Sequence, residues 1–269
     1  MPIKQALLNT ERAQGFSILE IVIALTIFAF LAYGIASTQK TGRDYNKYFE
    51  NRKVLEEAKV AVITFAQTNG YLPCPDGGLI IDGLEDRTSG ICASINGRLP
   101  YRTLGLPAFD EWGAHIYYAI PTNANTSASA DDPTLMASYF NANAVAGITG
   151  SPPVFDLNTA PNAAGAVTGS NKICGENAVT CVAATPAADM VETAAVAVLV
   201  SFGDNGEFTW NNLGNALQFS TKEFENTDGD NYFWKESGSY AEDFDDQLVW
   251  ITGFDIKSAM LRSDIGLRE

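Results

Sequence analysis

An apolar run near the N-terminus constrains this chain of 269 residues more than any other feature. From Phe16 the sequence reads FSILEIVIALTIFAFLAYGIAS, and three polar residues interrupt it before Ser37, namely Ser17, Glu20 and Thr26. A helix of about 20 consecutive apolar residues is long enough to cross the ~30 Å hydrocarbon core of a bilayer. We therefore expect residues 16–37 to form a transmembrane helix.

The charges on the two sides of this run predict its orientation. Lys4 and Arg12 precede the run with only Glu11 against them, whereas the whole chain carries a net charge of −15. Because basic residues tend to stay on the cytoplasmic side, we expect a cytoplasmic N-terminus and an exported remainder. A surface this acidic also repels phosphate backbones, which disfavours direct binding of nucleic acid.

A secretory signal peptide is the competing interpretation of such an N-terminus. It requires small residues at a cleavage site after the run, and Ala32-Tyr33-Gly34 or Gly34-Ile35-Ala36 would serve. Glu20 favours a retained span instead, because a carboxylate within a membrane is costly unless it is protonated or paired, and so it usually has a function. The simpler explanation of Glu20 is an interfacial position from which its carboxylate reaches water.

The arrangement of the motif favours the retained span. Gly15-Phe16-Ser17-Ile18-Leu19-Glu20, followed by the long apolar stretch, closely resembles the type III signal of type IV prepilins and type II secretion pseudopilins. The resemblance implies that a prepilin peptidase cuts between Gly15 and Phe16, removes residues 1–15 as a leader and methylates the new amine of Phe16. It also implies that Glu20 neutralises the Phe16 amine of a neighbouring subunit and so sets the register of assembly.

The same resemblance implies partners and a location. The partners are the prepilin peptidase, other pilin or pseudopilin subunits and an inner-membrane assembly platform. The expected location is the bacterial inner membrane, crossed once, with a periplasmic C-terminal domain that joins a periplasmic or extracellular filament after assembly.

Beyond the apolar run the pattern predicts a continuous helix to residue 68. Residues 38–68 contain no proline, and Asn69-Gly70 tolerates the left-handed conformation that ends helices. Apolar residues recur at spacings of three and four over this segment, which predicts an amphipathic helix packed on a globular domain. They are Tyr45, Tyr48, Phe49, Leu55, Ala58, Val62 and Phe65.

From residue 69 onward the texture changes to short strands and turns. We expect strands at His115–Ile120, Ala195–Phe202, Tyr232–Lys235 and Gln247–Thr252, and a closing helix at Phe254–Leu261. Residues 121–190 are poor in charge and read as an irregular insertion with a short helix near Thr134–Asn141. The predicted fold is α+β and pilin-like, with one long N-terminal helix on an antiparallel sheet of an exported domain, residues 69–269.

Four cysteines lie in the exported part. An oxidising compartment makes disulfides the default for them. Three pairings are formally open, and we favour the two local ones, Cys74 with Cys92 and Cys174 with Cys181. Thiolates this scattered make a zinc site improbable.

Two acidic segments raise the question of a metal. Residues 227–231, TDGDN, and 242–246, EDFDD, concentrate oxygen ligands of the kind that suits calcium, which fixes the C-terminal loop of some pseudopilins. The twelve-residue calcium-loop pattern fails, because position twelve counted from Asp228 is Ser239. Acidic turns are also ordinary hairpin chemistry, so we expect no bound cofactor and keep calcium as the alternative.

The predicted function is structural, with no catalytic residue. We expect a subunit of a type IV pilus or a type II secretion pseudopilus, and its size favours a minor position. A filament-displayed adhesin or ligand-binding module, with residues 121–190 as its binding face, is the alternative. An anchored hydrolase is less favoured, because the single histidine, His115, has no recognisable nucleophile at a suitable spacing.

Overall fold

The computed structural model describes residues 17–125, 136–142, 155, 159–161, 170–218, 220–236 and 244–262, except for the side chains of residues 35–42. The chain divides into two compact units, Met1–Asn46 and Lys47–Glu269. Gly15 and Phe16, the expected cleavage and methylation positions, lie outside the described residues.

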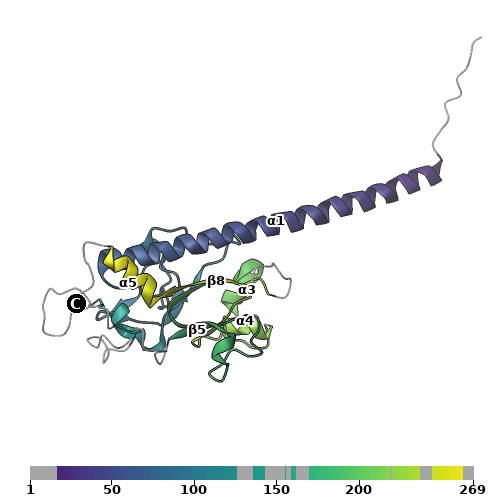
Figure 1. Cartoon of the computed structure of the whole chain (residues 1–269). Helices are drawn as coiled ribbons and strands as arrows, with labels where there is room; N and C mark the ends of the chain where they lie inside the picture. The colour runs from purple at the N-terminus through teal and green to yellow at the C-terminus, as the bar shows by residue number, and fades with distance from the viewer. Residues whose placement is uncertain are drawn as a thin grey trace, which may run out of the picture. The chain divides into compact units, whose positions relative to one another are not determined.

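The first described element is α1 (Ile18–Asn69), which begins within two residues of the predicted start (Figure 1). In the first unit its large apolar side chains are exposed on every side of the helix, from Ile18 at 82% to Tyr33 at 76%. Among the described residues, however, no helix combines the length and the apolarity needed to cross a membrane, so the span expected over residues 16–37 is not found there.

In the second unit α1 contributes one buried stripe to the core. Asn51, Leu55, Ala58, Val62 and Ala66 are each 0–1% exposed, and their spacing of three and four residues places them on one face of the helix. The predicted stripe is therefore correct at three positions in its middle. Its first residues, Tyr45 and Phe49, are exposed instead.

The helix ends where the sequence predicts. Gly70 follows Asn69 with a φ of 81°, and its N–H donates to the carbonyl oxygen of Ala66 at 2.8 Å. This left-handed conformation turns the chain away from the helix axis. Glycine adopts it readily, whereas a residue with a Cβ at position 70 would be strained.

The second unit is built on a mixed, mostly antiparallel sheet of six strands among the described residues. In chain order these strands are β3 (Asn96–Arg98), β4 (Tyr117–Ala119), β5 (Asn171–Cys174), β6 (Met190–Ser201), β7 (Tyr232–Trp234) and β8 (Gln247–Thr252). A separate two-stranded ribbon joins β1 (Arg87–Thr88) to β2 (Ile91–Cys92). One pairing corrects the expected antiparallel sheet, because β7 runs parallel to β5.

The central strand is β6, which pairs with three others. Ala195 is opposite Asn171 of β5 and also opposite Thr252 of β8, so these two strands lie on opposite edges of β6. Farther along, Val198–Val200 pairs with both β4 and β8. β5 and β4 therefore share one edge in succession, and β8 occupies the other.

Both faces of this sheet are covered, which explains the continuous apolar sequence of β6. On one face Val196 and Leu199 pack with the stripe of α1 and with Ile256 of α5 (Gly253–Leu261). On the other face Val198 and Val200 pack with a cluster that includes Trp210 of α3 (Gly206–Asn211). The sequence analysis anticipated the first layer and not the second.

The remaining described helices are short. They are α2 (Tyr101–Leu104), α4 (Thr221–Glu225) and the 3₁₀ helices η1 (Thr122–Asn125), η3 (Met136–Tyr139), η4 (Ala187–Asp189) and η5 (Gly203–Asn205). Within the expected irregular insertion, residues 121–190, the structure places a 3₁₀ helix where a short helix was predicted, and it adds the strand β5. The predicted irregular segment was therefore too long, because four of its residues form a strand of the sheet.

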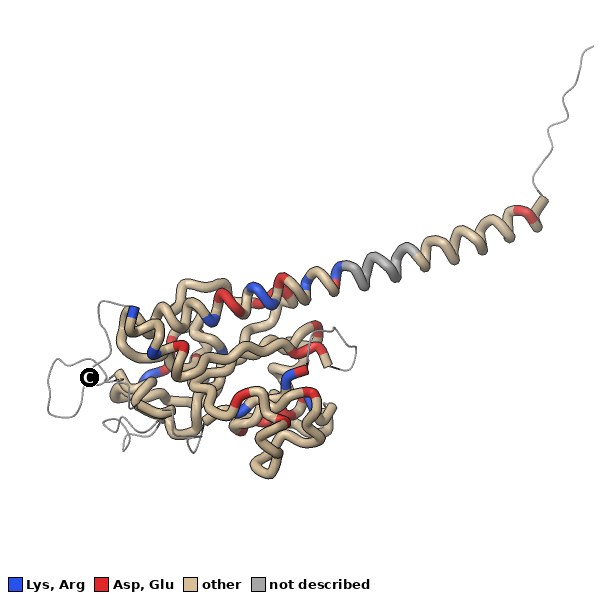
Figure 2. The backbone as a smooth tube through the Cα atoms, in the orientation of Figure 1, with Lys and Arg blue, Asp and Glu red and all other residues tan. Residues whose placement is uncertain are grey.

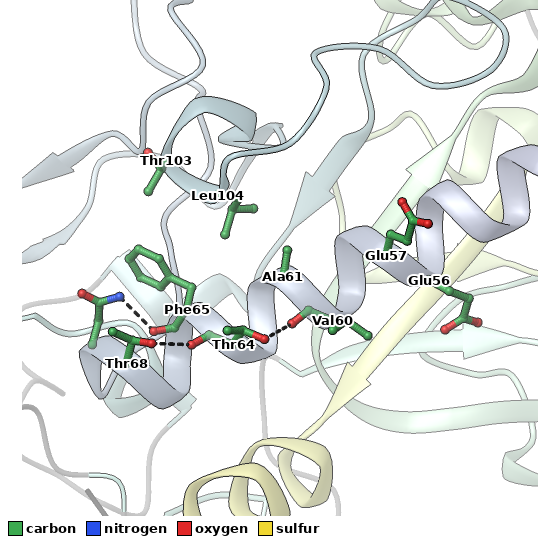
Figure 3. Close-up of a pocket in the computed structure, with 10 residues that line it drawn as sticks. Glu56, Glu57, Val60, Ala61, Thr64, Phe65, Thr68, Thr103 and Leu104 are labelled. Carbon is green, nitrogen blue, oxygen red and sulfur yellow. Dashed lines mark hydrogen bonds between the residues drawn. The ribbon is translucent and has the colours of Figure 1, made fainter. Parts of the chain in front are cut away.

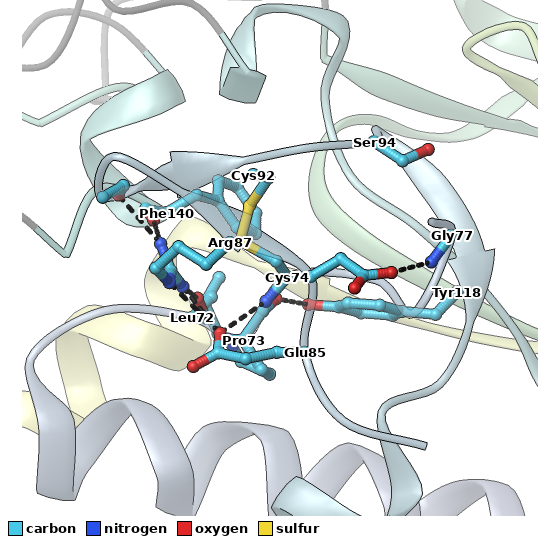
Figure 4. Close-up of a disulfide and its surroundings, with 12 residues drawn as sticks. Leu72, Pro73, Cys74, Gly77, Glu85, Arg87, Cys92, Ser94, Tyr118 and Phe140 are labelled. Atoms are coloured by element: carbon cyan, nitrogen blue, oxygen red, sulfur yellow. Dashed lines mark hydrogen bonds and ion pairs between the residues drawn. A yellow bond between two sulfur atoms is a disulfide. The ribbon is translucent and has the colours of Figure 1, made fainter. Parts of the chain in front are cut away.

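The structure forms both local disulfides, Cys74–Cys92 and Cys174–Cys181. Beside the first, Arg87 donates to the carbonyl oxygens of Leu72, Gly90 and Phe140 and pairs with Glu85 at 2.8 Å (Figure 4). This guanidinium thus joins three chain segments through their carbonyl oxygens, of which that of Gly90 also accepts from the N–H of Ala142. The disulfide and Arg87 together fasten the loop that follows α1.

Candidate functional site

The start of α1 carries the acidic residue that the sequence motif singles out. Glu20 Oε2 accepts a hydrogen bond from the backbone N–H of Ser17 at 2.9 Å, and Ser17 Oγ accepts one from the N–H of Leu19 at 3.2 Å. This is the reciprocal capping expected of a serine followed three residues later by a glutamate. The Glu20 carboxylate therefore lies at the positive end of the helix, where it counters free N–H groups.

The helix segment after Glu20 is apolar over its whole surface. Residues 21–34 carry no lysine, arginine, aspartate or glutamate (Figure 2). Two side chains in this stretch carry a hydroxyl, Thr26 and Tyr33, and that of Thr26 donates to the carbonyl oxygen of Ile23 at 2.8 Å. Phe28 and Phe30 are 70% and 79% exposed. A helix that is hydrophobic all round is ordinarily buried, either in lipid or among other chains.

A second candidate site is a cluster of three carboxyl groups beside β7. Glu225 at the end of α4 meets Asp228 and Asp230 of the following turn, and one oxygen from each lies within 4.8 Å of the others. Gly229 has a φ of 79°, which allows the turn to bring the two aspartates round to one side. Their position is fixed, because Asp228 Oδ1 accepts from the N–H of Asp230 and Asp230 Oδ1 accepts from the N–H of Tyr232.

Burial and mutual repulsion make these three groups hard to ionise together. Burial, followed by the charges of Asp230 and Asp228, raises the pKa of Glu225 to about 8. Burial also raises the pKa of Asp230 to about 6 and raises that of Asp228. In addition, Glu225 Oε1 is buried and accepts no hydrogen bond from any described residue. Calcium prefers carboxylate oxygens as ligands, and its charge would offset their mutual repulsion, so the donor set fits a calcium ion.

The sequence analysis found this cluster only in part. Asp228 and Asp230 belong to the predicted segment 227–231, but Glu225 was missed, although the spacing Glu-x-x-Asp-x-Asp could have indicated it. The second predicted segment does not join the cluster through its described residues. Asp245 Oδ2 accepts from the N–H of Asp204 at 2.6 Å, and Asp246 Oδ2 accepts from Asn226 at 2.8 Å. Glu242 and Asp243 lie outside the described residues.

The single histidine is packed among aromatic rings. His115 is half-buried between Tyr101 and Phe109, with ring centroids 5.9 Å and 4.7 Å away, and Trp210 meets it edge-on. Burial and the nearby charge of Arg98 lower the pKa of its imidazole, which is therefore neutral at pH 7. Its Nδ1 lies 2.9 Å from the carbonyl oxygen of Ala108.

The described part of residues 121–190 contributes to the interior of the second unit. Met136, Tyr139 and Phe140 are fully buried, and Phe155 packs against Tyr139 with a centroid distance of 4.6 Å. These side chains pack against the core and are not available to a ligand. The residues between these described pieces, which the binding-face hypothesis needs, lie outside the described residues.

Comparison of the chain with protein-family models, with curated proteins and with solved structures gave no match.

Proposed function

We propose that this protein is a structural subunit, in a minor position, of a type IV pilus or a type II secretion pseudopilus. One observation carries the proposal: Gly15-Phe16-Ser17-Ile18-Leu19-Glu20 leads directly into a helix whose apolar side chains are exposed on all sides. The signal resembles that of prepilins, and the exposed helix supplies the surface by which such a subunit is held first in a membrane and then in a filament.

The chemistry of Glu20 fits this role. Cleavage after Gly15 creates a positive amine at Phe16, one residue before Ser17. The Glu20 carboxylate accepts a hydrogen bond from the N–H of Ser17, so it lies in the first turn of the helix, close in sequence to this new amine. Pairing with the amine of a neighbouring subunit joins two charges that would each be costly to bury alone, and it fixes the axial position of that neighbour.

The proposal includes location and partners. Prepilin peptidase removes residues 1–15 and methylates Phe16 at the inner membrane, from which the assembly platform draws the subunit into the filament. The second unit, with its two disulfides, then occupies the periplasmic side, where disulfides persist.

The decisive test is the intact mass and N-terminal sequence of the chain produced with and without prepilin peptidase. We expect N-methyl-Phe16 as the first residue and two intact disulfides when the peptidase is present, and an uncut chain when it is absent. Gly15→Val provides the control, because it should prevent cutting without affecting export. A chain that begins near Ser37 would refute the proposal and restore the secretory signal peptide.

A second experiment separates assembly from helix capping. Glu20→Ala should leave membrane insertion intact and abolish recovery of the subunit in sheared filaments. Ser17→Ala removes the other half of the reciprocal cap, and Glu50→Ala removes an exposed carboxylate farther along the same helix. Both should assemble normally. Loss of assembly in Ser17→Ala equal to that in Glu20→Ala would assign Glu20 to capping alone.

A further inference from the structure

An exposed apolar loop lies within the chain segment that the Cys74–Cys92 disulfide closes. Leu79, Ile80 and Ile81 are consecutive, and they are 106%, 74% and 52% exposed. We call residues 79–81 the apolar tip. Three adjacent aliphatic side chains directed into water are unusual on a surface that carries this much charge, and such patches commonly mark contacts with other proteins.

The base of the loop is held firmly. The Asp86 carboxylate accepts from the N–H groups of Gly77 and Gly78 at 2.9 Å and 2.5 Å, and the Asp76 carboxylate accepts from the N–H of Gly83 at 2.7 Å. Gly83 has a φ of 78°, and a Cβ there would lie 2.4 Å from the ring of Tyr101. The loop therefore needs glycine at this position, and it presents the apolar tip on a fixed base.

An apolar groove of about 630 Å³ lies in the same unit, between α1 and α2 (Figure 3). Val60, Ala61 and Phe65 of α1 form its floor, and Leu104 of α2 forms the opposite wall. Val60 is 61% exposed although it is aliphatic. We call this the α1–α2 groove. Its volume is in the range of cavities that enclose small ligands or a few side chains.

The base of the loop that carries the tip and the groove both adjoin α2. Thr103 lines the groove, while the N–H groups of Arg102 and Thr103 donate to the carbonyl oxygen of Gly83 at the base of the tip. A surface that carries both a protrusion and a recess can pair with itself across a two-fold axis, so that the tip of each copy enters the groove of the other.

The charges near these two features agree with the same arrangement. Arg102 is exposed beside the tip, and its guanidinium donates to the carbonyl oxygen of Asp82. Glu56 and Glu57 are exposed at the rim of the groove, and neither forms an ion pair with a described residue. In the two-fold arrangement Arg102 of one copy approaches the acidic rim of the other.

We propose that the second unit forms a two-fold dimer in which the apolar tip of each copy occupies the α1–α2 groove of the other. The contact uses residues 56–104 only, so it does not depend on the proposed filament role or on the N-terminal helix. Three side chains and one groove make a small interface, and we therefore expect a weak dimer that assembles at micromolar concentration or above.

Disulfide cross-linking of the full chain tests this proposal. All four native cysteines are in disulfides, so an introduced cysteine is the only free thiol. Two chains with tags of different size, one carrying Ile80→Cys and the other Val60→Cys, are purified in a mild detergent, mixed and gently oxidised. We expect a cross-linked product that contains both tags, at a yield at least tenfold above that of Ile80→Cys mixed with Val179→Cys. Val179 is 90% exposed and lies outside the proposed contact.

Two further variants distinguish a specific contact from random collision. Adding Leu79→Asp to the Ile80→Cys chain places a charge in the apolar groove of the partner and should lower the yield at least tenfold. Adding Val179→Asp should leave it unchanged. Both positions are almost fully exposed, so neither substitution disturbs folding. Equal yields with Val60→Cys and Val179→Cys, or a yield that Leu79→Asp does not lower, would overturn the dimer.

Discussion

Replacing Asn51 with alanine is expected to destabilise the second unit by about 2–4 kcal/mol. Asn51 lies in the buried stripe of α1 and is fully inaccessible to solvent. Its amide nitrogen donates to Ser201 Oγ of β6 and to Gln247 Oε1 of β8, each at 2.8 Å, and its amide oxygen accepts from the N–H of Glu111 at 3.3 Å. One side chain thus joins the helix to two strands and to the loop before β4.

The magnitude follows from what alanine leaves behind. Gln247 Oε1 loses its donor and the N–H of Glu111 loses its acceptor, while Ser201 keeps its hydrogen bond to Asp110 at 2.5 Å. The buried Gln247 oxygen without a donor costs about 1–3 kcal/mol, and the lost hydrogen bond from the partly buried N–H of Glu111 adds about 1 kcal/mol, which together give the expected range.

The measurement is guanidinium unfolding of the purified chain followed by tryptophan fluorescence, since all four tryptophans lie in the second unit. Gln67→Ala is the matched control, because Gln67 also lies on α1 but makes a single hydrogen bond, to the carbonyl oxygen of Ala259. It should cost about 1 kcal/mol. A difference between the two variants smaller than about 0.5 kcal/mol would refute the reasoning.

The isosteric change Asn51→Asp sharpens the test. It keeps the shape of the side chain but replaces the donating amide by a carboxylate that faces Gln247 Oε1. We expect it to destabilise the chain more than alanine at pH 7, because the new charge is buried next to acceptors. The difference should shrink as the pH falls and the new carboxyl becomes protonated. A loss that stays the same from pH 7 to pH 4 would contradict this account.

Three further predictions concern the disulfides and the acidic cluster. Replacing both cysteines of Cys74–Cys92 with alanine should lower the free energy of unfolding by about 3 kcal/mol, and the same change at Cys174–Cys181 by about 2 kcal/mol, as measured by denaturant unfolding. The first disulfide closes the longer loop, with a sequence separation of 18 against 7. The reverse order of the two losses would contradict this reason. Because the pKa of Glu225 is raised to about 8, its protonated form stabilises the fold at pH 4.5, and this contribution is lost as the pH rises to 8. Glu225→Gln should therefore be more stable than the parent chain at pH 8.5 by about 1–2 kcal/mol, a value reduced for partial exposure, and equally stable near pH 4.5. No gain in stability at pH 8.5 would contradict the raised pKa of Glu225. Millimolar calcium should raise the melting temperature of the parent chain at pH 8 more than at pH 5, where protons compete, and Glu225→Gln should lose the effect; an unchanged melting temperature at pH 8 would exclude the calcium site.

Local sequence patterns predicted those parts of the fold that depend on neighbouring residues. The predicted strand Gln247–Thr252 coincides with β8, with Val249 and Ile251 in the core that faces α1 and Trp250 on the opposite face. The end of α1 at Asn69 was predicted equally well, because a single Asn-Gly pair determines it. Both disulfides join cysteines that are close in sequence, so the local pairing was the simplest choice.

The features that the sequence did not reveal depend on contacts between distant residues. The four residues of β5 lie in a stretch with little apolar periodicity, and they become a strand because β6 and β7 supply partners on both sides. Glu225 joins Asp228 and Asp230 only because α4 ends where the turn before β7 begins. The apolar tip was also missed, since a short aliphatic run reads as a buried strand unless its exposure is known.

The two apolar surfaces that the described chain exposes differ in how they can be covered. The helix of the first unit is apolar around its whole circumference over residues 21–34, so we expect lipid or a bundle of like helices to surround it. The tip and the groove of the second unit are bounded by Arg102, Glu56 and Glu57. A polar rim around a small apolar centre permits dissociation into water, whereas a bare apolar helix does not. We therefore expect Leu79→Asp to weaken contacts between second units while leaving retention through the helix unchanged. The two surfaces can consequently be tested one at a time in the same chain.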